Sequence, residues 1–355
     1  MPTRRNVLSL GCALSATALL KNVAFAEVPT TQQSDSATDP MSFVNPEFRP
    51  AVEQLAKAGP VQPLNAGTLK AEREFMNQLA SPILPSPPVT ERTIAGSPGA
   101  PPVRVFVVGD SPGSSKPAVL HFHHGAYVAG SAAASRRDIQ DLSVAHDCVA
   151  VSVEYRLAPE TTFPGSLEDN YTALRWIFTN AKQLGIDTKR IAIKGESAGG
   201  GHAAALAIAA RDRGEVPICL QVLIYPMLDD RTCSSKTMPP FLGHYIWTPE
   251  SNRFAWASFL GVPPGTARVP RNSVPARISN LNGLPPAFIG VGSIDLLAPE
   301  SIDYAQRLVA AGVAVELNVV PGAFHAFNYI APDTSLSREF EHAWNEALRR
   351  AFLQS

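Results

Sequence analysis

The fold is decided by the stretch IAIKGESAGG, residues 191–200. Its first three residues are typical of a short buried strand, and the alanine-rich residues 198–213 are typical of a helix. Between them, residues 195–199 match the pattern Gly-x-Ser-x-Gly at a strand-to-helix turn, which is the context that a nucleophile elbow requires. Glycine is expected on both sides of Ser197, because such a turn is strained and neighbouring backbone packs closely.

Two other glycine patterns compete with this one. Residues 109–113 also match Gly-x-Ser-x-Gly, but prolines at 112 and 117 forbid a following helix, so we expect a hairpin loop there. Residues 199–204 match a dinucleotide-binding fingerprint, which requires an acidic residue about 20 positions further on. The acid that follows the next predicted strand, Asp229, lies too far along, so no nucleotide cofactor is expected.

Strand-like and helix-like runs alternate on both sides of the elbow. The apolar runs expected to be strands are 103–108, 118–122, 148–153, 191–193, 222–225, 287–291 and 313–320, with helical patterns at 135–146, 167–184, 198–213 and 298–311. This alternation predicts the α/β fold class, with a mostly parallel sheet flanked by helices.

The chain divides into four parts. Residues 1–26 are expected to be a signal peptide, 27–45 a polar linker, 46–85 a pair of N-terminal cap helices and 86–355 the α/β domain. The cap helices are expected at about 46–58 and 66–80, the second with Leu69, Met76, Leu79 and Ala80 on one face. Within the α/β domain, an insertion at about 228–284 contains no strong strand and one helix near 250–260.

This insertion bears on where a ligand binds. An insertion of this kind projects over the carboxyl ends of the strands, which is where ligands bind in open α/β sheets. Together with the N-terminal helices it is expected to form a lid over the site.

The first 26 residues predict export. Arg4 and Arg5 begin a basic region, an apolar run follows, and Ala24–Ala26 is a small-x-small cleavage site. The apolar run is shorter than the roughly 20 residues that a membrane helix needs, so no stable membrane span is expected. The paired arginines favour a twin-arginine signal to the bacterial periplasm or the outside. The alternatives are an ordinary secretory signal and, through Cys12, a lipoprotein signal.

Composition excludes other classes of protein. The chain has 355 residues, of which 45% are hydrophobic and 17% charged, so it can bury a large core and is neither disordered nor fibrous. The formal net charge is -1 and no lysine–arginine cluster occurs, which leaves no electrostatic footprint for a nucleic acid. We therefore expect a small-molecule substrate and no nucleic-acid partner.

A serine nucleophile needs a base that is held by an acid. On this architecture the chain order is serine, acid, histidine. Asp295 follows the predicted strand 287–291, and His325 follows the strand 313–320, so both lie at carboxyl ends of strands in that order. The rivals, Asp303, Glu300 and His342, all fall inside predicted helices.

The turn after the predicted strand 118–122 is the place for an oxyanion hole. Residues 121–127 read HFHHGAY, in which His-x-His also suggests a metal site. Metal-dependent hydrolases of the β-lactamase type need His-x-His-x-Asp-His, and the Asp-His pair is absent here. No metal and no cofactor are therefore expected.

These motifs together resemble the hormone-sensitive-lipase-like esterases (bacterial family IV, HGGG-type), a family of α/β hydrolases. The similarity covers roughly residues 90–335. It also includes the segments 155–160, 163–164, 195–200, 284–286 and 295–300. The resemblance implies an α/β-hydrolase fold with a helical cap, and Ser197, Asp295 and His325 as the catalytic residues.

The resemblance further implies an oxyanion hole made by the backbone N–H groups of Gly125, Ala126 and Ala198. Two residues depart from the family pattern, since His124 replaces its first glycine and Ala126 its third. A side chain costs energy where φ is positive, although histidine tolerates it better than most residues. His124 is thus expected either to narrow the pocket or to point away from it.

Several further residues are expected near the site. Those expected to support it are His123, His124 and Glu196, and the candidates for the substrate pocket are Tyr127, Tyr225, Trp247 and Phe324. The predicted function is a serine esterase that cleaves small or medium carboxylic esters through an acyl-enzyme. The alternatives are a lactone or amide hydrolase on the same residues, or a non-catalytic binding protein on the same fold.

Overall fold

The computed structural model describes residues 39–57, 59 and 61–354. The predicted signal peptide, its cleavage site and Cys12 lie outside these residues. Of the predicted linker only the last part is described, and there Pro40–Phe43 forms a 3₁₀ helix, η1. This short helix begins after Asp39, whose carboxylate accepts the N–H of Met41 at 3.0 Å.

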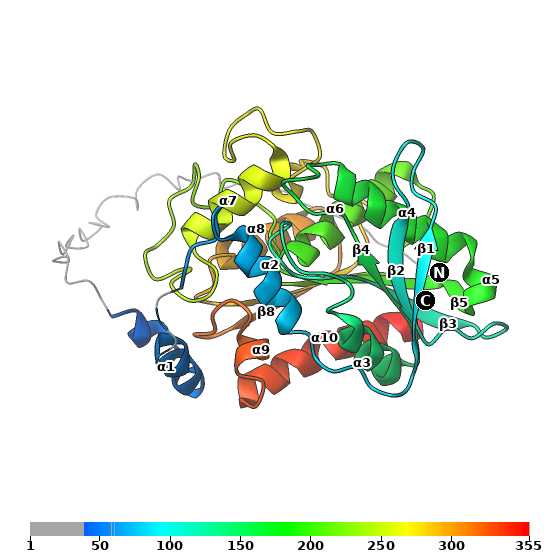
Figure 1. Ribbon diagram of the computed structural model, residues 1–355, viewed down its shortest axis with the longest axis horizontal. Coiled ribbons are helices and arrows are strands. Elements are labelled where there is room, and N and C mark those ends of the chain that lie inside the picture. Colours follow the sequence, from blue (N-terminus) through cyan, green and yellow to red (C-terminus); the bar gives the residue numbers. More distant parts are fainter. Residues whose placement is uncertain (1–38, 58, 60, 355) are drawn as a thin grey trace, which may run out of the picture. The chain divides into compact units, whose positions relative to one another are not determined.

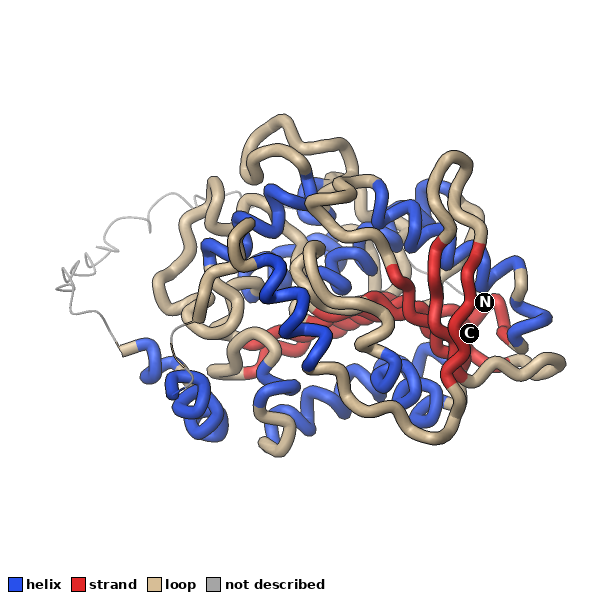
Figure 2. Tube along the Cα trace, viewed as in Figure 1, coloured by secondary structure: helices blue, strands red, loops and turns tan. Residues whose placement is uncertain are grey.

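The strands of the described residues gather in one sheet (Figure 2). This sheet has eight strands in the order β1-β2-β4-β3-β5-β6-β7-β8. They are β1 (Val89–Ile94), β2 (Val103–Val108), β3 (Lys116–Phe122), β4 (Val149–Glu154), β5 (Ile186–Glu196), β6 (Leu220–Ile224), β7 (Ala287–Gly292) and β8 (Val315–Val320). The β1–β2 and β2–β4 pairs are antiparallel and the other neighbours are parallel. The predicted α/β fold with a mostly parallel sheet is confirmed.

Helices cover both faces of this sheet (Figure 1). They are η2 (Pro46–Phe48), α1 (Arg49–Lys57), α2 (Leu69–Gln78), α3 (Arg136–His146), α4 (Gly165–Thr179), α5 (Ala181–Leu184), α6 (Ala198–Arg213), α7 (Pro249–Leu260), η3 (Pro275–Arg277), α8 (Ala298–Ala310), α9 (Phe327–Ile330) and α10 (Ser335–Gln354). One face packs mainly against α3 and α10, and the other against α4, α6 and α8.

The core explains why the central strands read as continuous apolar runs. In β5, Ile191 and Ile193 belong to the core on one side of the sheet and Ala192 to the core on the other, and all three are fully buried. A strand that is covered on both faces has no solvent-facing positions, so its sequence need not alternate.

Two sequence predictions about the sheet are corrected. The strand β1 was not anticipated, because it lies at an edge of the sheet and buries only Ile94 fully, so it has no apolar run. Residues 109–113 form no hairpin: β2 and β3 are not paired with each other, because β4 lies between them. The chain therefore crosses over β4 at this loop.

The N-terminal helices and the insertion contact each other. The N–H of Leu64, just before α2, donates to Ser251 Oγ of α7 at 3.0 Å, and the rings of Phe43 and Phe241 stack with centroids 4.5 Å apart. The expected apolar face of the second helix is only partly buried. Leu69 packs in the core, but α2 ends at Gln78 and Leu79 is 60% exposed. No helix in the described part of the chain has the length and apolarity to cross a membrane.

Candidate active site

The elbow lies between β5 and α6. Ser197 has φ 55° and ψ -118°, a conformation that L-residues adopt only under constraint. Its N–H donates to the Ile224 carbonyl of β6 at 2.9 Å, which fixes the turn against the next strand. A Cβ added at Gly199 would lie 2.1 Å from the Phe122 carbonyl oxygen, and one at Gly195 would lie 2.2 Å from the Gly199 carbonyl oxygen. The expected reason for glycine on both sides of the serine is confirmed.

The three residues chosen by their placement after strands are connected by hydrogen bonds. Ser197 Oγ lies 3.0 Å from His325 Nε2, and His325 Nδ1 lies 2.8 Å from Asp295 Oδ2. The other carboxylate oxygen of Asp295 accepts the N–H of Leu297 at 2.9 Å. All three side chains are buried. With Nδ1–H donating to the carboxylate, Nε2 is free to accept the proton of the serine hydroxyl.

The rival acids and base lie elsewhere. Glu300 is buried, and one of its oxygens accepts the N–H of Leu228 at 2.7 Å and that of Asp229 at 3.2 Å, while the other pairs with the Thr232 hydroxyl. Burial raises the pKa of Glu300 to about 8. Glu300 therefore fixes the start of the insertion, residues 228–232, through these hydrogen bonds. Asp303 and His342 are exposed on α8 and α10.

The loop after β3 contains three successive residues with positive φ, residues 125–127, which we call the oxyanion loop. Gly125, Ala126 and Tyr127 have φ of 127°, 57° and 66° in succession. No described residue accepts a hydrogen bond from the N–H of Gly125, Ala126 or Ala198, so these amides are available to a developing oxyanion. The strain expected at His124 is absent, because the left-handed backbone begins one residue later, at Gly125.

Comparison with known proteins agrees with this geometry. A sequence model of the α/β-hydrolase fold family matches residues 119–329, more than half of the chain. The chain belongs to this family. The matched segment contains the elbow, both partners of Ser197 and the loop after β3, so the resemblance stated from the sequence is confirmed.

Relatives of this hydrolase are known by function and by structure. It is 34% identical to carboxylesterase NlhH of Mycobacterium tuberculosis over 326 residues, which cover 88% of this chain and 99% of the relative. It is 33% identical to an ethyl acetate hydrolase of Pseudomonas putida, covering 64% and 71% of the two chains. The structure of a bacterial heroin esterase is similar with a TM-score of 0.77 at 32% identity, covering 88% and 98%.

The predicted supporting histidines of the hydrolase lie under and beside the oxyanion loop. His123 is buried with its ring stacked on that of Tyr155, 4.1 Å between centroids, and its Nδ1 lies 2.7 Å from the His124 carbonyl oxygen. Burial lowers the pKa of His123 to about 3, so this ring is neutral. His124 is half-buried, and its ring lies 6.0 Å from that of Tyr329. Burial also lowers the pKa of His124.

Glu196 belongs to a buried polar cluster that the sequence did not reveal. Its carboxylate forms an ion pair with Lys194 and lies 3.0 Å from His121 Nε2, and His121 Nδ1 lies 3.1 Å from Ser152 Oγ. Burial opposes the charge of Glu196, but Lys194 and His121 overcome it and hold the pKa of Glu196 well below its usual range. The two-residue spacing of Lys194 and Glu196 on one strand was the signal for this pair.

The histidines that suggested a metal site therefore have other contacts. The rings of His121 and His123 have separate partners, Glu196 and Ser152 for the first and Tyr155 for the second. Within the described part of the chain, no three His, Cys, Asp or Glu side chains are grouped as metal ligands would be.

All four pocket candidates are buried in the core of the structure. Phe324 is fully buried against Phe48, and Tyr127 is 2% exposed, so neither offers surface to a substrate in this structure. These aromatic side chains pack in the core. The sequence alone does not distinguish this role from that of lining a pocket. Tyr225 is also buried and contacts the His325 ring edge-on, 4.7 Å between centroids.

Trp247 brings the insertion to the site. Its ring lies 6.0 Å from that of His325, and its indole N–H donates to Asn252 Oδ1 at 3.2 Å. Of the four candidates it is the one that the insertion contributes. The predicted closeness of insertion and site is therefore seen in a direct ring contact.

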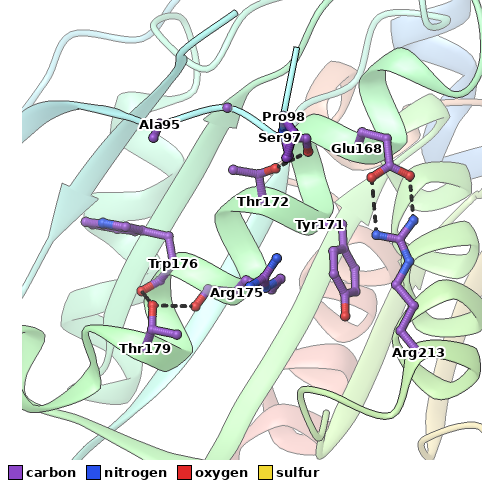
Figure 3. A pocket seen from close by; sticks show the side chains of 11 residues that line it. Ala95, Ser97, Pro98, Glu168, Tyr171, Thr172, Arg175, Trp176, Thr179 and Arg213 are labelled. Atoms are coloured by element: carbon purple, nitrogen blue, oxygen red, sulfur yellow. Dashed lines mark hydrogen bonds and ion pairs between the residues drawn. The ribbon is translucent and has the colours of Figure 1, made fainter. Parts of the chain in front are cut away.

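A separate surface groove of about 380 Å³ lies along α4 (Figure 3). The Arg213 guanidinium lies over the Tyr171 ring, 3.9 Å from its centroid, and forms an ion pair with Glu168. The Tyr171 hydroxyl donates to Glu215 at 2.9 Å. These groups pair with one another, and the groove contains neither Ser197 nor its partners.

Proposed function

We propose that this hydrolase cleaves small or medium carboxylic esters through an acyl-enzyme on Ser197. The observation that carries the proposal is the continuous hydrogen-bond path from Ser197 Oγ through His325 to Asp295. The names of the relatives, a carboxylesterase and an ethyl acetate hydrolase, support an ester substrate.

The geometry accounts for each proton in this reaction. His325 Nε2 takes the Ser197 proton as Oγ attacks the ester carbonyl carbon, and the resulting oxyanion accepts hydrogen bonds from the loop amides and from Ala198. Collapse of this intermediate expels the alcohol, which takes the proton from His325. A water molecule then gives His325 a proton and attacks the acyl carbon. As the bond between the acyl carbon and Oγ breaks, His325 returns that proton to Ser197 Oγ, and the carboxylic acid is released. Asp295 holds the imidazole in the required tautomer.

The test is covalent labelling combined with a substrate series. A fluorophosphonate should form one adduct on the folded protein, located at Ser197 by peptide mass spectrometry, and should abolish turnover of p-nitrophenyl esters. Rates across acyl chains from acetate to decanoate, beside a lactone and an anilide, define the substrate class. No adduct and no ester turnover would indicate a binding protein on a hydrolase fold. Faster turnover of the lactone or anilide would move the proposal to that alternative.

Export through a twin-arginine signal is proposed as well, on the sequence of residues 1–26 alone. N-terminal sequencing of the mature protein should begin at Glu27, and replacing Arg4 and Arg5 by lysine should block export. Export that survives this replacement would indicate an ordinary secretory signal, and a protein retained with Met1 in the cytosol would contradict export.

A further inference from the structure

The oxyanion loop is strained and must be held from outside. Gly125, Ala126 and Tyr127 all have positive φ, and two of them carry a Cβ. For residues that carry a Cβ, such conformations persist only where the surroundings determine them. Part of the support is backbone: the N–H of Ala129 donates to the Gly125 carbonyl at 2.8 Å, and that of Ala158 to the Tyr127 carbonyl at 3.0 Å.

The side chain of Tyr127 connects this loop to the elbow. Its hydroxyl donates to the Met227 carbonyl at 3.0 Å, and the N–H of Met227 donates to the Ser197 carbonyl at 3.0 Å. A single residue after β6 thus receives a hydrogen bond from the oxyanion loop and gives one to the nucleophile. Burial raises the pKa of Tyr127 well above its usual value, so the hydroxyl keeps its proton and remains a donor.

Packing leaves the hydroxyl little room to move. A Cβ added at Gly201, in the first turn of α6, would lie 2.1 Å from the Tyr127 hydroxyl oxygen and 2.3 Å from the Met227 carbonyl oxygen. On the other side, the Tyr127 ring stacks on Phe259 of the insertion, 4.2 Å between centroids, and meets His202 edge-on at 4.9 Å. The ring is therefore held between α6 and α7, with its hydroxyl directed at Met227.

We propose that Tyr127 is a positioning residue whose hydroxyl fixes the oxyanion loop relative to Ser197, an inference that rests on the proposed function. The oxyanion hole takes donors from two separate segments, the loop after β3 and Ala198 at the start of α6. Both sets of donors must lie within hydrogen-bond distance of one oxygen atom as its charge develops. The path Tyr127–Met227–Ser197 sets the distance between these two segments.

The test compares Tyr127→Phe with Tyr171→Phe. Both changes remove one hydroxyl that makes one hydrogen bond, but Tyr171 lies in the groove along α4 (Figure 3). For a p-nitrophenyl ester, Tyr127→Phe should lower kcat about tenfold or more with KM nearly unchanged, because donors that are misplaced act mainly on the transition state. Tyr171→Phe should keep the kcat of the unaltered protein.

A transition-state analogue separates positioning from a general loss of structure. A trifluoromethyl ketone adds to Ser197 and places an oxyanion in the hole, so Tyr127→Phe should raise its Ki by the same factor by which kcat/KM falls. Both values are normalised to the active sites counted by fluorophosphonate labelling. If the activity per labelled site and the Ki are unchanged, the hydroxyl serves stability alone and the proposal is wrong.

A second variant decides the matter if Tyr127→Phe does not fold. Gly201→Ala keeps the tyrosine but adds a Cβ against its hydroxyl, so it should give the same paired loss in kcat and analogue affinity; unchanged values per labelled site would overturn the proposal. Failure of the proposed function is distinguishable, because the unaltered protein would then show no ester turnover, or Ser197→Ala would keep the turnover. With Ser197→Ala inactive and Tyr127→Phe fully active, only the positioning role is excluded.

Discussion

The pattern Gly-x-Ser-x-Gly occurs twice in this chain, and the two copies differ in nearly every physical respect. The copy at 195–199 includes the carboxyl end of β5 and opens α6, with a buried Ser197 whose φ is positive. The copy at 109–113 precedes β3, at the opposite end of the parallel strands, and opens no helix. Its Ser111 is half-buried and its N–H donates to the Leu184 carbonyl at 3.0 Å.

The second position of each copy shows the same contrast. Glu196 is buried with Lys194 and His121 around its carboxylate, whereas Asp110 is half-exposed and forms an ion pair with Arg92. The pattern of residues is therefore insufficient to make a nucleophile. Each copy follows a strand, so what distinguishes the elbow is the helix that begins after it and a base within hydrogen-bond distance of its serine.

The largest expected difference between the two copies is the effect on kcat of removing the serine hydroxyl. Ser197→Ala should lower kcat for a p-nitrophenyl ester by on the order of 10⁴-fold or more, because the serine, histidine and aspartate act as a unit. Ser111→Ala should leave kcat unchanged, since no base lies beside that hydroxyl. Steady-state kinetics of both folded variants measures the contrast. Equal activity of the two variants would contradict the assignment of the elbow.

Much of this contrast could be predicted from the sequence. The central strands are covered on both faces, so they appear in the sequence as apolar runs. The expected strand-to-helix turn at Ser197 identified the catalytic copy of the pattern. Asp295 and His325 followed from the rule that functional side chains gather at the carboxyl ends of parallel strands. These inferences succeeded because each depends on local pattern and on one rule of topology.

The remaining features depend on contacts that are distant in sequence. The crossing of the chain over β4 was not predicted, because the sequence of the loop at 109–113 does not indicate which strands pair with each other. Tyr127 and Phe324 were assigned to the pocket because an aromatic residue near a site can point either way. The buried cluster of Lys194 and Glu196 escaped notice because its other members, His121 and Ser152, come from other strands.

A second comparison concerns Glu196 and Asp110, the acidic residues at the second position of each copy. Glu196→Gln leaves the buried ammonium of Lys194 without its carboxylate, and breaking a buried pair in this way costs about 3–5 kcal/mol of unfolding free energy. Asp110→Asn breaks a partly exposed pair, for which about 1 kcal/mol or less is expected. Urea unfolding at pH 7 measures both. Similar losses in the two variants would show that burial does not distinguish the copies.

The dependence of the unfolding free energy on pH provides a second test of the Lys194–Glu196 pair. Because the pKa of Glu196 is lowered in the folded protein, its ionised form stabilises the fold at pH values above the unfolded carboxyl pKa of about 4.3. That contribution is lost as the pH falls further, toward the folded pKa. The stability gap between the unaltered protein and Glu196→Gln should therefore shrink below about pH 4. A gap that stays constant down to pH 3 would contradict the lowered pKa.

The smallest expected difference lies in the last glycine of each copy. Gly199→Ala places a Cβ against the carbonyl oxygens of Phe122 and His123, which end β3 and lead into the oxyanion loop. Neither backbone can move freely, so the change should cost about 3 kcal/mol, the upper end for overpacking, and should lower kcat by displacing the loop amides. Gly113→Ala meets no atom within 4 Å, but φ is +86°, and this conformation costs about 1–2 kcal/mol for alanine. Unfolding free energies thus differ little between the two variants, whereas kcat should fall only in Gly199→Ala. If Gly199→Ala keeps the full kcat, close packing of α6 against the end of β3 is not what holds the oxyanion loop in place.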